Sequence, residues 1–195
     1  MAIVGILLAA GRGRRFDPSG GRNKLLQCLP GGETVVAASA KAMLAALPKV
    51  VAVVGPQGGD VAAQLRDLGC DVTVCARADD GMGASLAHAI GQAVQADGWL
   101  IALGDMPHVQ PSTIAALAQA VEQGSGIAVP VMQGRRGNPV AFGRQHLAGL
   151  LAAGGDQGAR NIVKAGPVRE VEVDDPGIFQ DIDTTADLSI RGVSS

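Results

Sequence analysis

Short apolar runs alternate with longer amphipathic segments along the first two thirds of the chain. The runs are nearly all apolar, which is typical of parallel strands covered on both faces. We therefore predict strands at residues 3–8, 49–54, 71–75, 99–103 and 127–131.

The intervening segments have helical periodicity, and we predict helices at residues 34–47, 60–68, 83–96 and 112–123. Pro48 and Gly69 fall where the first two helices should end, and Pro111 with Ser112 marks a helix start. Regular alternation of strands and helices predicts a single-domain α/β fold of three layers, α/β/α, around a mostly parallel, mixed sheet.

The rhythm changes after Val131. "MQGRRGNPVAF" predicts a turn between two strands, residues 144–153 and 158–164 predict helices, and residues 168–173 alternate like a strand. We expect two halves without a linker: residues 1–131, and a smaller subdomain of residues 132–195 laid on the sheet.

Composition excludes several classes of protein. The 195 residues are 47% hydrophobic, 17% charged and 2% aromatic, with a net charge of −2, which argues against disorder and against nucleic-acid binding. The three cysteines match no zinc spacing, and no apolar run is long enough for a membrane span. With no signal-peptide pattern at the start, we expect a cytoplasmic protein with reduced thiols and no membrane association.

The most informative stretch is "GILLAAGRGRR", residues 5–15, where a strand runs into a glycine-rich loop. Gly11 and Gly13 let backbone N–H groups approach a phosphate, and ligands of α/β sheets lie at the carboxyl ends of the strands. The loop belongs to a local basic cluster: Arg12, Arg14, Arg15, Arg22 and Lys24.

Other phosphate motifs fit this loop poorly. A dinucleotide-binding turn needs a third glycine where Phe16 stands, and a Walker A loop needs a hydroxyl residue after Lys24. The alternative to a phosphate-binding loop is a glycine-rich surface turn with solvated arginines, which would bind no ligand.

"LLAAGRGRRF" followed by Lys24 resembles the signature L-A-[AG]-G-x-G-x-R of nucleotidyltransferases, in particular the molybdenum cofactor cytidylyltransferases of the MobA-like NTP transferase family. The resemblance implies a nucleotide-diphospho-sugar-transferase-like, Rossmann-like fold. It also implies catalytic roles for Arg15 and Lys24. The nucleotide would be bound along the loop by Leu8, Ala9, Ala10, Gly11, Arg12, Gly13 and Arg14.

Asp105, in "LIALGDMPHV", is the first charged residue after a buried strand and falls at the same sheet edge as the loop. A carboxylate there can hold Mg²⁺ that also binds nucleotide phosphates, although Asp and Pro favour turns in any case. The segment resembles the metal-binding G-D-M-P of the cytidylyltransferases, which implies a catalytic, metal-binding Asp105 and Mg²⁺ (or Mn²⁺) as cofactor.

A second acid is expected from "FQDIDTTADL". Asp181 and Asp183 point to the same side if this segment is extended, and Thr184 or Thr185 is a candidate cap for a final helix. The family resemblance favours Asp183 as the second metal ligand; Asp181 is the alternative.

Three further segments resemble the family in the same order along the chain. "DDGMGASLAHAI" resembles G-M-x-x-S-L and makes Gly81 and Ser85 candidates for nucleotide binding. "PVMQGRRGNPVAF" resembles P-V-x-x-G-x-R-G-[HN]-P-V, with Asn138 where His is common, and "GGDQGAR" resembles G-D-x-G-A-R. By this resemblance, residues 1–131 form a nucleotide-binding half and residues 132–195 an acceptor side.

The implied function is transfer of a nucleoside monophosphate to a phosphorylated acceptor, with release of pyrophosphate. Ala9 and Ala10 before Gly11 resemble the cytidylyl type, so the resemblance favours CTP as donor and molybdopterin as acceptor, with a molybdenum hydroxylase as a possible protein partner. Two alternatives remain: a non-catalytic nucleotide- or pterin-binding accessory protein, and a nicotinamide-dependent oxidoreductase.

Overall fold

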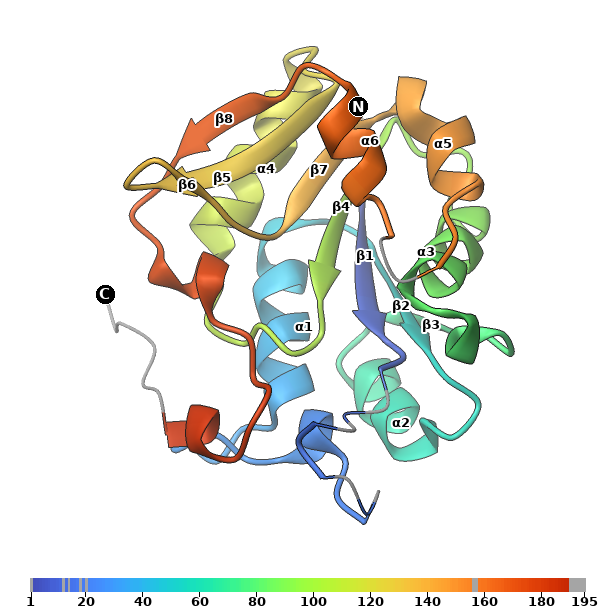
Figure 1. The fold of residues 1–195 in the computed structure, drawn as a ribbon, viewed down its shortest axis with the longest axis vertical. Coiled ribbons are helices and arrows are strands. Elements are labelled where there is room, and N and C mark those ends of the chain that lie inside the picture. Colours follow the sequence, from blue (N-terminus) through green and yellow to red (C-terminus); the bar gives the residue numbers. More distant parts are fainter. Residues whose placement is uncertain are drawn as a thin grey trace.

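A single mixed β-sheet forms the centre of the protein (Figure 1). The computed structural model describes residues 2–11, 13, 15–17, 19, 21–155 and 158–189. Within them the sheet has the order β3-β2-β1-β4-β7-β5-β6, and β8 pairs with β5. Its strands are β1 (Ile3–Ala9), β2 (Val50–Val54), β3 (Asp71–Val74), β4 (Gly98–Leu103), β5 (Ile127–Met132), β6 (Arg135–Arg136), β7 (Val140–Gly143) and β8 (Arg169–Glu172).

The first four strands are mutually parallel, whereas β7 runs antiparallel to both β4 and β5. β6 is also antiparallel to β5, and β8 is parallel to it. The carboxyl ends of β1 and β4 lie side by side, with Leu8 opposite Leu103. This register brings the loops that follow the two strands to the same edge of the sheet.

Helices cover both faces of the sheet. α1 (Val35–Ala46), α2 (Gly59–Asp67) and α4 (Pro111–Glu122) pack on one face, where Val36, Leu65 and Leu117 enter the core. α3 (Met82–Gly91), α5 (Leu147–Leu151) and α6 (Arg160–Ala165) pack on the other. The predicted three-layer α/β fold is confirmed.

Short 3₁₀ turns connect several of these elements: η1 (Lys24–Leu26), η2 (Ala78–Asp80), η3 (Arg144–His146), η4 (Pro176–Phe179) and η5 (Ala186–Ser189). Among the described residues, every helix is too short or too polar to cross a bilayer.

Local signals placed most helix starts correctly. The Thr34 hydroxyl accepts a hydrogen bond from the Ala37 amide and caps α1, and Pro111 occupies the first turn of α4. The helix predicted at residues 83–96 is too long, because α3 ends at Gly91 and turns follow. In these turns the Ala93 carbonyl accepts a hydrogen bond from the Trp99 indole at 3.0 Å.

The prediction of strands buried on both faces is wrong for β3. Its residues are half-buried or exposed, because β3 lies at the edge of the sheet. The second part of the chain does not form a separate sheet: β7 lies between β4 and β5, so residues from both predicted halves pair directly. The different roles of residues 1–131 and 132–195 stay a prediction.

Candidate active site

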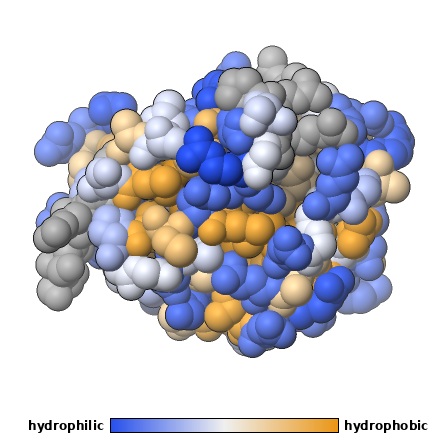
Figure 2. Space-filling model, turned by 90° about the horizontal axis from the view of Figure 1, so that it is seen from below, coloured by the Kyte–Doolittle hydropathy of each residue, from blue (hydrophilic) through white to orange (hydrophobic). Residues whose placement is uncertain are grey.

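A cavity of about 660 Å³ opens at the carboxyl ends of β1 and β4. Figure 2 looks onto this edge and shows apolar surface in the middle of the face, surrounded by hydrophilic residues. The volume suits a small-molecule ligand, and an open α/β sheet binds ligands at this edge. The lining residues come from segments far apart in sequence: Leu8, Ala9, Ala10, Gly11, Gly13, Arg15, Phe16, Lys24, Leu25, Ala78, Asp79, Gly81, Met82, Ser85, Leu103, Asp105 and Asp183.

The glycine-rich loop forms the part of the cavity wall that follows β1. Gly13 has a φ of +59°, a conformation that favours glycine, and its carbonyl accepts hydrogen bonds from the amides of Phe16 and Asp17. A Cβ at Gly13 would lie 3.3 Å from Cγ of Lys24, so the lysine stem packs directly on this turn. Arg12 and Arg14, both predicted to bind the nucleotide, lie outside the described residues.

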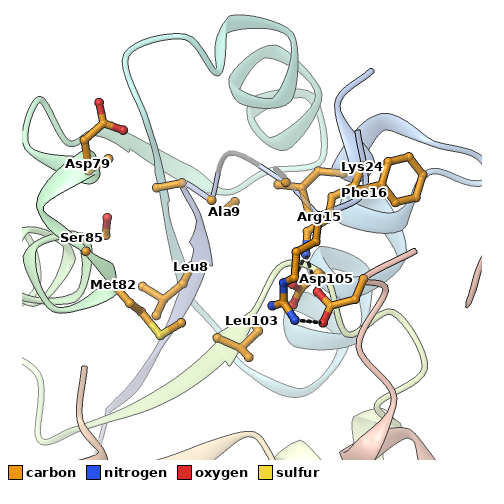
Figure 3. Close-up of a pocket in the computed structure, with 17 residues that line it drawn as sticks. Leu8, Ala9, Arg15, Phe16, Lys24, Asp79, Met82, Ser85, Leu103 and Asp105 are labelled. Atoms are coloured by element: carbon orange, nitrogen blue, oxygen red, sulfur yellow. Dashed lines mark hydrogen bonds and ion pairs between the residues drawn. The ribbon is translucent and has the colours of Figure 1, made fainter. Parts of the chain in front are cut away.

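Four charged side chains meet on one side of the cavity (Figure 3). Lys24 Nζ lies 2.6 Å from Asp105 Oδ2 and 3.5 Å from Asp183 Oδ1, and an Arg15 guanidinium nitrogen lies 2.7 Å from Asp183 Oδ2. The Lys24 side chain is 10% exposed, whereas that of Arg15 is 80% exposed. The structure therefore brings together the predicted catalytic residues and both predicted metal ligands.

Backbone contacts fix the position of Asp105. The buried Ser39 hydroxyl of α1 donates to the Gly104 carbonyl at 3.0 Å, and the Gly104 amide donates to the Leu8 carbonyl at 2.9 Å. The Asp105 carbonyl accepts from the Ile182 amide at 2.8 Å. These contacts join the ends of β1 and β4 to the segment that carries Asp183.

Asp105 has an unused acceptor. Its Oδ1 is buried and has no hydrogen-bond partner among the described residues. Since a buried carboxylate oxygen is costly without a partner, this atom is suited to a cation. Oxygen donors from one or two carboxylates are what Mg²⁺ uses when phosphates and waters complete its shell. The described residues contain no cluster of three or more His, Cys, Asp or Glu that could hold a metal by itself.

Asp181 and Asp183 have different surroundings. Asp183 contacts Lys24 and Arg15. Desolvation raises the pKa of the Asp181 carboxyl, and the negative charge of Asp183 adds to the shift, with a smaller contribution from Asp105. Asp181 is thus close to the other two acids, while Asp183 is the one paired with the cations.

Thr184, one of the two predicted caps of the final helix, donates two hydrogen bonds to Asp187. The Asp187 carboxylate, in η5, is the acceptor: it binds the amides of Asp183 and Thr184 and the Thr184 hydroxyl. The Thr184 bonds lower the pKa of Asp187. An Asp is the stronger acceptor here because its charge faces several donors at once.

η2 and the start of α3 form the opposite wall, where Ser85, Met82 and Asp79 lie on the other side of the cavity from the charged cluster (Figure 3). Ser85 is buried at 3% exposure, and Gly81, with a φ of +111°, makes the sharp entry into α3. Leu8 and Ala9 lie between the two walls. This arrangement leaves an apolar floor with polar groups at both ends.

Sequence reasoning missed several lining residues, among them Phe16, Leu25, Ala78, Asp79, Met82 and Leu103. Met82 and Asp79 stand beside the predicted Gly81, and Leu103 stands two residues before Asp105, so proximity to a motif was the available signal. Phe16 and Leu25 carried the same signal, because they directly follow the predicted Arg15 and Lys24.

The remaining family-like segments lie at other places in the fold. In "RRGNP", the Asn138 amide donates to the Ile178 carbonyl at 3.0 Å, and Gly137 packs against Ile178, so this segment contacts the chain leading to Asp183. In "GGDQGAR", the Gly155 carbonyl accepts from the Gly83 amide of α3 at 2.8 Å. Asp156 and Gln157 lie outside the described residues.

Comparison with known protein families identifies the family of the chain that carries this site. The model of the MobA-like NTP transferase domain matches residues 5–172, most of the chain. The chain belongs to the MobA-like NTP transferase family. The predicted family is confirmed. Membership of this family makes the protein a nucleotidyltransferase.

Solved structures agree with this assignment of a MobA-like NTP transferase. Rv0371c from Mycobacterium tuberculosis H37Rv is similar, with 30% identity, coverage of 96% of this chain and 95% of that chain, and a TM-score of 0.83. The complex of Rv0371c with manganese has 29% identity, coverage of 96% of both chains and a TM-score of 0.78.

A nucleotidyl transferase from Methanothermobacter thermautotroptrophicus has 27% identity, coverage of 95% of this chain and 94% of that chain, and a TM-score of 0.80. No curated protein has a significant sequence match to this MobA-like NTP transferase.

Proposed function

We propose that this protein is a cytidylyltransferase that moves CMP from CTP to a phosphorylated pterin of the molybdopterin type, with Mg²⁺ as cofactor. One observation carries the proposal. Lys24, Arg15, Asp105 and Asp183 converge at one end of a cavity that the glycine-rich loop after β1 helps to line.

In the proposed reaction, a phosphate oxygen of the acceptor attacks the α-phosphorus of the triphosphate. The new bond joins that oxygen to the α-phosphorus, the bond from the α-phosphorus to the bridging oxygen breaks, and pyrophosphate leaves with the electron pair. Catalysis of this kind depends on positioning and on stabilising charge rather than on covalent participation of the protein.

The chain's own residues divide this task between them. Backbone amides around Gly11 to Arg14 would bind the β- and γ-phosphates, where glycine allows close approach. Lys24 and Arg15 would stabilise the negative charge that develops during transfer. For this, both cations have to exchange their present carboxylate partners for phosphate oxygens.

Asp105 and Asp183 would hold the metal ion, and the unpartnered Oδ1 of Asp105 supports this assignment. When bound, the ion would neutralise phosphate charge as a Lewis acid. The manganese complex of Rv0371c supports the use of a divalent cation.

The choice of CTP rests on the end of β1. Ala9 and Ala10 line the cavity with small side chains, so a base can lie close to the strand, and Ser85 and Gly81 face the same space. One methyl group at such a wall contributes about 1 to 3 kcal/mol of discrimination. The acceptor rests on the family resemblance of the segments around Asn138 and Gly155, and a molybdenum hydroxylase is the proposed protein partner.

The deciding experiment measures pyrophosphate release with each of the four ribonucleoside triphosphates, with and without molybdopterin, in Mg²⁺ or Mn²⁺. We expect release with CTP that depends on both molybdopterin and the metal. Preference for another triphosphate would overturn the choice of CTP.

Nucleotide and pterin binding without any release of pyrophosphate would instead favour the accessory-protein alternative. An equilibrium binding measurement with CTP, made on the same preparation, separates that case from an inactive sample.

A further inference from the structure

The segment that leads from β8 to Asp183, residues 173–183, is attached to the protein at several points along its length. The Val173 amide donates to the Val131 carbonyl, the Ile178 carbonyl accepts from the Asn138 amide, and the Ile182 amide donates to the Asp105 carbonyl. Ile178 and Ile182 are buried in addition. We call residues 173–183 the C-terminal segment.

Asp175 is the most unusual residue of the C-terminal segment, because it is a carboxylate only 1% exposed. Its Oδ2 accepts hydrogen bonds from the Gln110 amide at 2.9 Å and from the Thr113 hydroxyl at 2.7 Å. Its Oδ1 accepts from the Gly177 amide at 2.9 Å. Both oxygens are therefore bound, as a buried charge requires.

Two of these donors belong to the start of α4. Gln110 is the N-cap residue of α4, but its side chain makes no capping hydrogen bond, and Pro111 has no N–H. Asp175 thus accepts from the amide of the N-cap residue, as the Glu or Gln of a capping box does, but from a distant part of the chain and at the positive end of the helix dipole. This contact ties the C-terminal segment to the loop between β4 and α4.

The same loop carries Asp105, and the C-terminal segment carries Asp183. Packing at Gly177 reinforces the contact: a Cβ there would lie 2.1 Å from the His108 carbonyl oxygen, so the two backbones touch. Residues 105–110 of the loop and residues 175–182 of the C-terminal segment are therefore joined at both ends. Gln110 bonds to Asp175 at one end, and Ile182 bonds to Asp105 at the other. Together they fix where Asp183 stands relative to Asp105.

We propose that Asp175 is a positioning residue, which sets the separation of the Asp105 and Asp183 carboxylates so that both contact one cation. This inference rests on the proposed function in one respect, the metal-binding role of the two acids. Stability alone is a weak reason for burying a carboxylate, because an apolar residue of similar size is often as good or better at a buried position.

The test compares Asp175→Asn with two controls. Asn keeps the shape but turns an N–H toward at least one of the three donors. Asp174→Asn makes the same charge change at the neighbouring, exposed position. Val121→Ala removes buried volume at the far end of α4. It controls for effects that come only from a lower stability of the fold.

Two measurements on the full chain report on the position of Asp183 relative to Asp105. They are hydrogen exchange of the Ile182 amide and the dissociation constant for Mn²⁺ alone. In Asp175→Asn we expect Ile182 to exchange at least about tenfold faster and Mn²⁺ to bind about 10- to 100-fold more weakly, the usual effect of losing a group that orients metal ligands. Neither control should change the Mn²⁺ affinity.

Unchanged Ile182 exchange and Mn²⁺ affinity in Asp175→Asn would overturn the proposal, and so would an equal loss of affinity in Val121→Ala. If Asp175→Asn does not fold, Thr113→Val removes a single hydrogen bond and should shift both measurements in the same direction by less; no shift there counts against the proposal. A wild-type protein that binds no Mn²⁺ also overturns it.

Failure of the proposed function has a different signature. If the Asp175→Asn shifts occur as expected but the wild type releases no pyrophosphate with any triphosphate, the positioning role stands and only the reaction is wrong.

Discussion

The Lys24 ammonium lies 2.6 Å from Asp105 Oδ2, so the cation predicted to act on phosphate is bound to the acid predicted to hold the metal. Lys24 also approaches Asp183 and is nearly buried, at 10% exposure of its side chain. A divalent ion on Asp105 Oδ1 would stand beside the Lys24 ammonium on Oδ2, and because the two positive charges repel each other, the lysine and the ion compete for this carboxylate. A bound triphosphate would relieve the competition by offering Lys24 another partner.

Lys24→Ala should therefore have opposite effects on turnover and on metal binding. We expect kcat to fall by about 10²- to 10³-fold, as for loss of one group that stabilises the transition state. We also expect Mn²⁺, without nucleotide, to bind at least about tenfold more tightly, since ~1.4 kcal/mol of removed competition is enough for that change. Pyrophosphate release and isothermal titration with Mn²⁺ measure the two effects.

Lys41→Ala is the matched control, because Lys41 is an exposed lysine paired with Glu33 away from the cavity. Weaker Mn²⁺ binding in Lys24→Ala would contradict the competition, and an unchanged kcat would remove Lys24 from the catalytic residues.

Asp105→Ala should reduce pyrophosphate release from CTP in the presence of Mg²⁺ and molybdopterin by at least about 10³-fold, because it removes the proposed metal ligand and the main partner of Lys24. The protein should stay folded by circular dichroism, since the Asp105 backbone contacts are retained. Asp67→Ala, an exposed acid of α2, serves as control. Full activity of Asp105→Ala would refute the metal assignment.

The choice between Asp183 and Asp181 as second ligand can be made by comparing their Asn variants. Asp183 contacts both cations of the cluster, whereas the pKa of Asp181 is raised by desolvation and by its acidic neighbours. We expect Asp183→Asn to weaken Mn²⁺ binding by about 10- to 100-fold and Asp181→Asn to change it little. The reverse order in a Mn²⁺ titration would assign the site to Asp181.

Gly137→Ala tests the contact between "RRGNP" and the C-terminal segment. An added Cβ would lie 2.6 Å from the Ile178 carbonyl oxygen, so the backbones have to separate. Overpacking of this kind costs about 1 to 3 kcal/mol, and 1 kcal/mol corresponds to roughly 2 to 4 °C in Tm at this chain length. Gly31→Ala, where a Cβ meets open space, should leave the Tm nearly unchanged in the same calorimetric scan.

Stability should fall in mild acid because of His108. Burial lowers the pKa of His108, and its Nε2 is buried without a hydrogen-bond partner among the described residues. The unfolded chain therefore binds a proton more readily than the folded one. The stabilisation is complete above the unfolded pKa of 6.5 and is lost as the pH falls below it toward the lower folded pKa, at up to about 1.4 kcal/mol per pH unit.

Urea unfolding of the wild type and of His108→Gln at pH 7.5 and pH 5.5 measures this loss, which should be smaller in the variant. Some loss should remain, because burial also lowers the pKa of His146. An equal pH dependence in both proteins would exclude His108 as a source.

The sequence predicted the strands around the site closely, because buried parallel strands are short apolar runs and the residues at their carboxyl ends meet by topology. Lys24, Asp105 and Asp183 were predicted on this basis and from the family resemblance, and the structure brings them together. The capping of α4 by Asp175 was not predicted, since it joins residues that no local pattern connects. For the same reason the hydrophobic pattern of the sequence does not predict that β7 lies between β4 and β5.

The path of the chain has a consequence for biosynthesis. β1 begins the cavity and the C-terminal segment completes it, so a chain growing on the ribosome exposes the glycine-rich loop and Lys24 long before Asp183 has been made. The acidic pair is then incomplete, and a nascent chain should bind a divalent ion poorly even when β1 to β4 have formed. Contacts between such distant parts of a sequence form late in folding, so binding of the proposed metal ion should accompany the last step of folding.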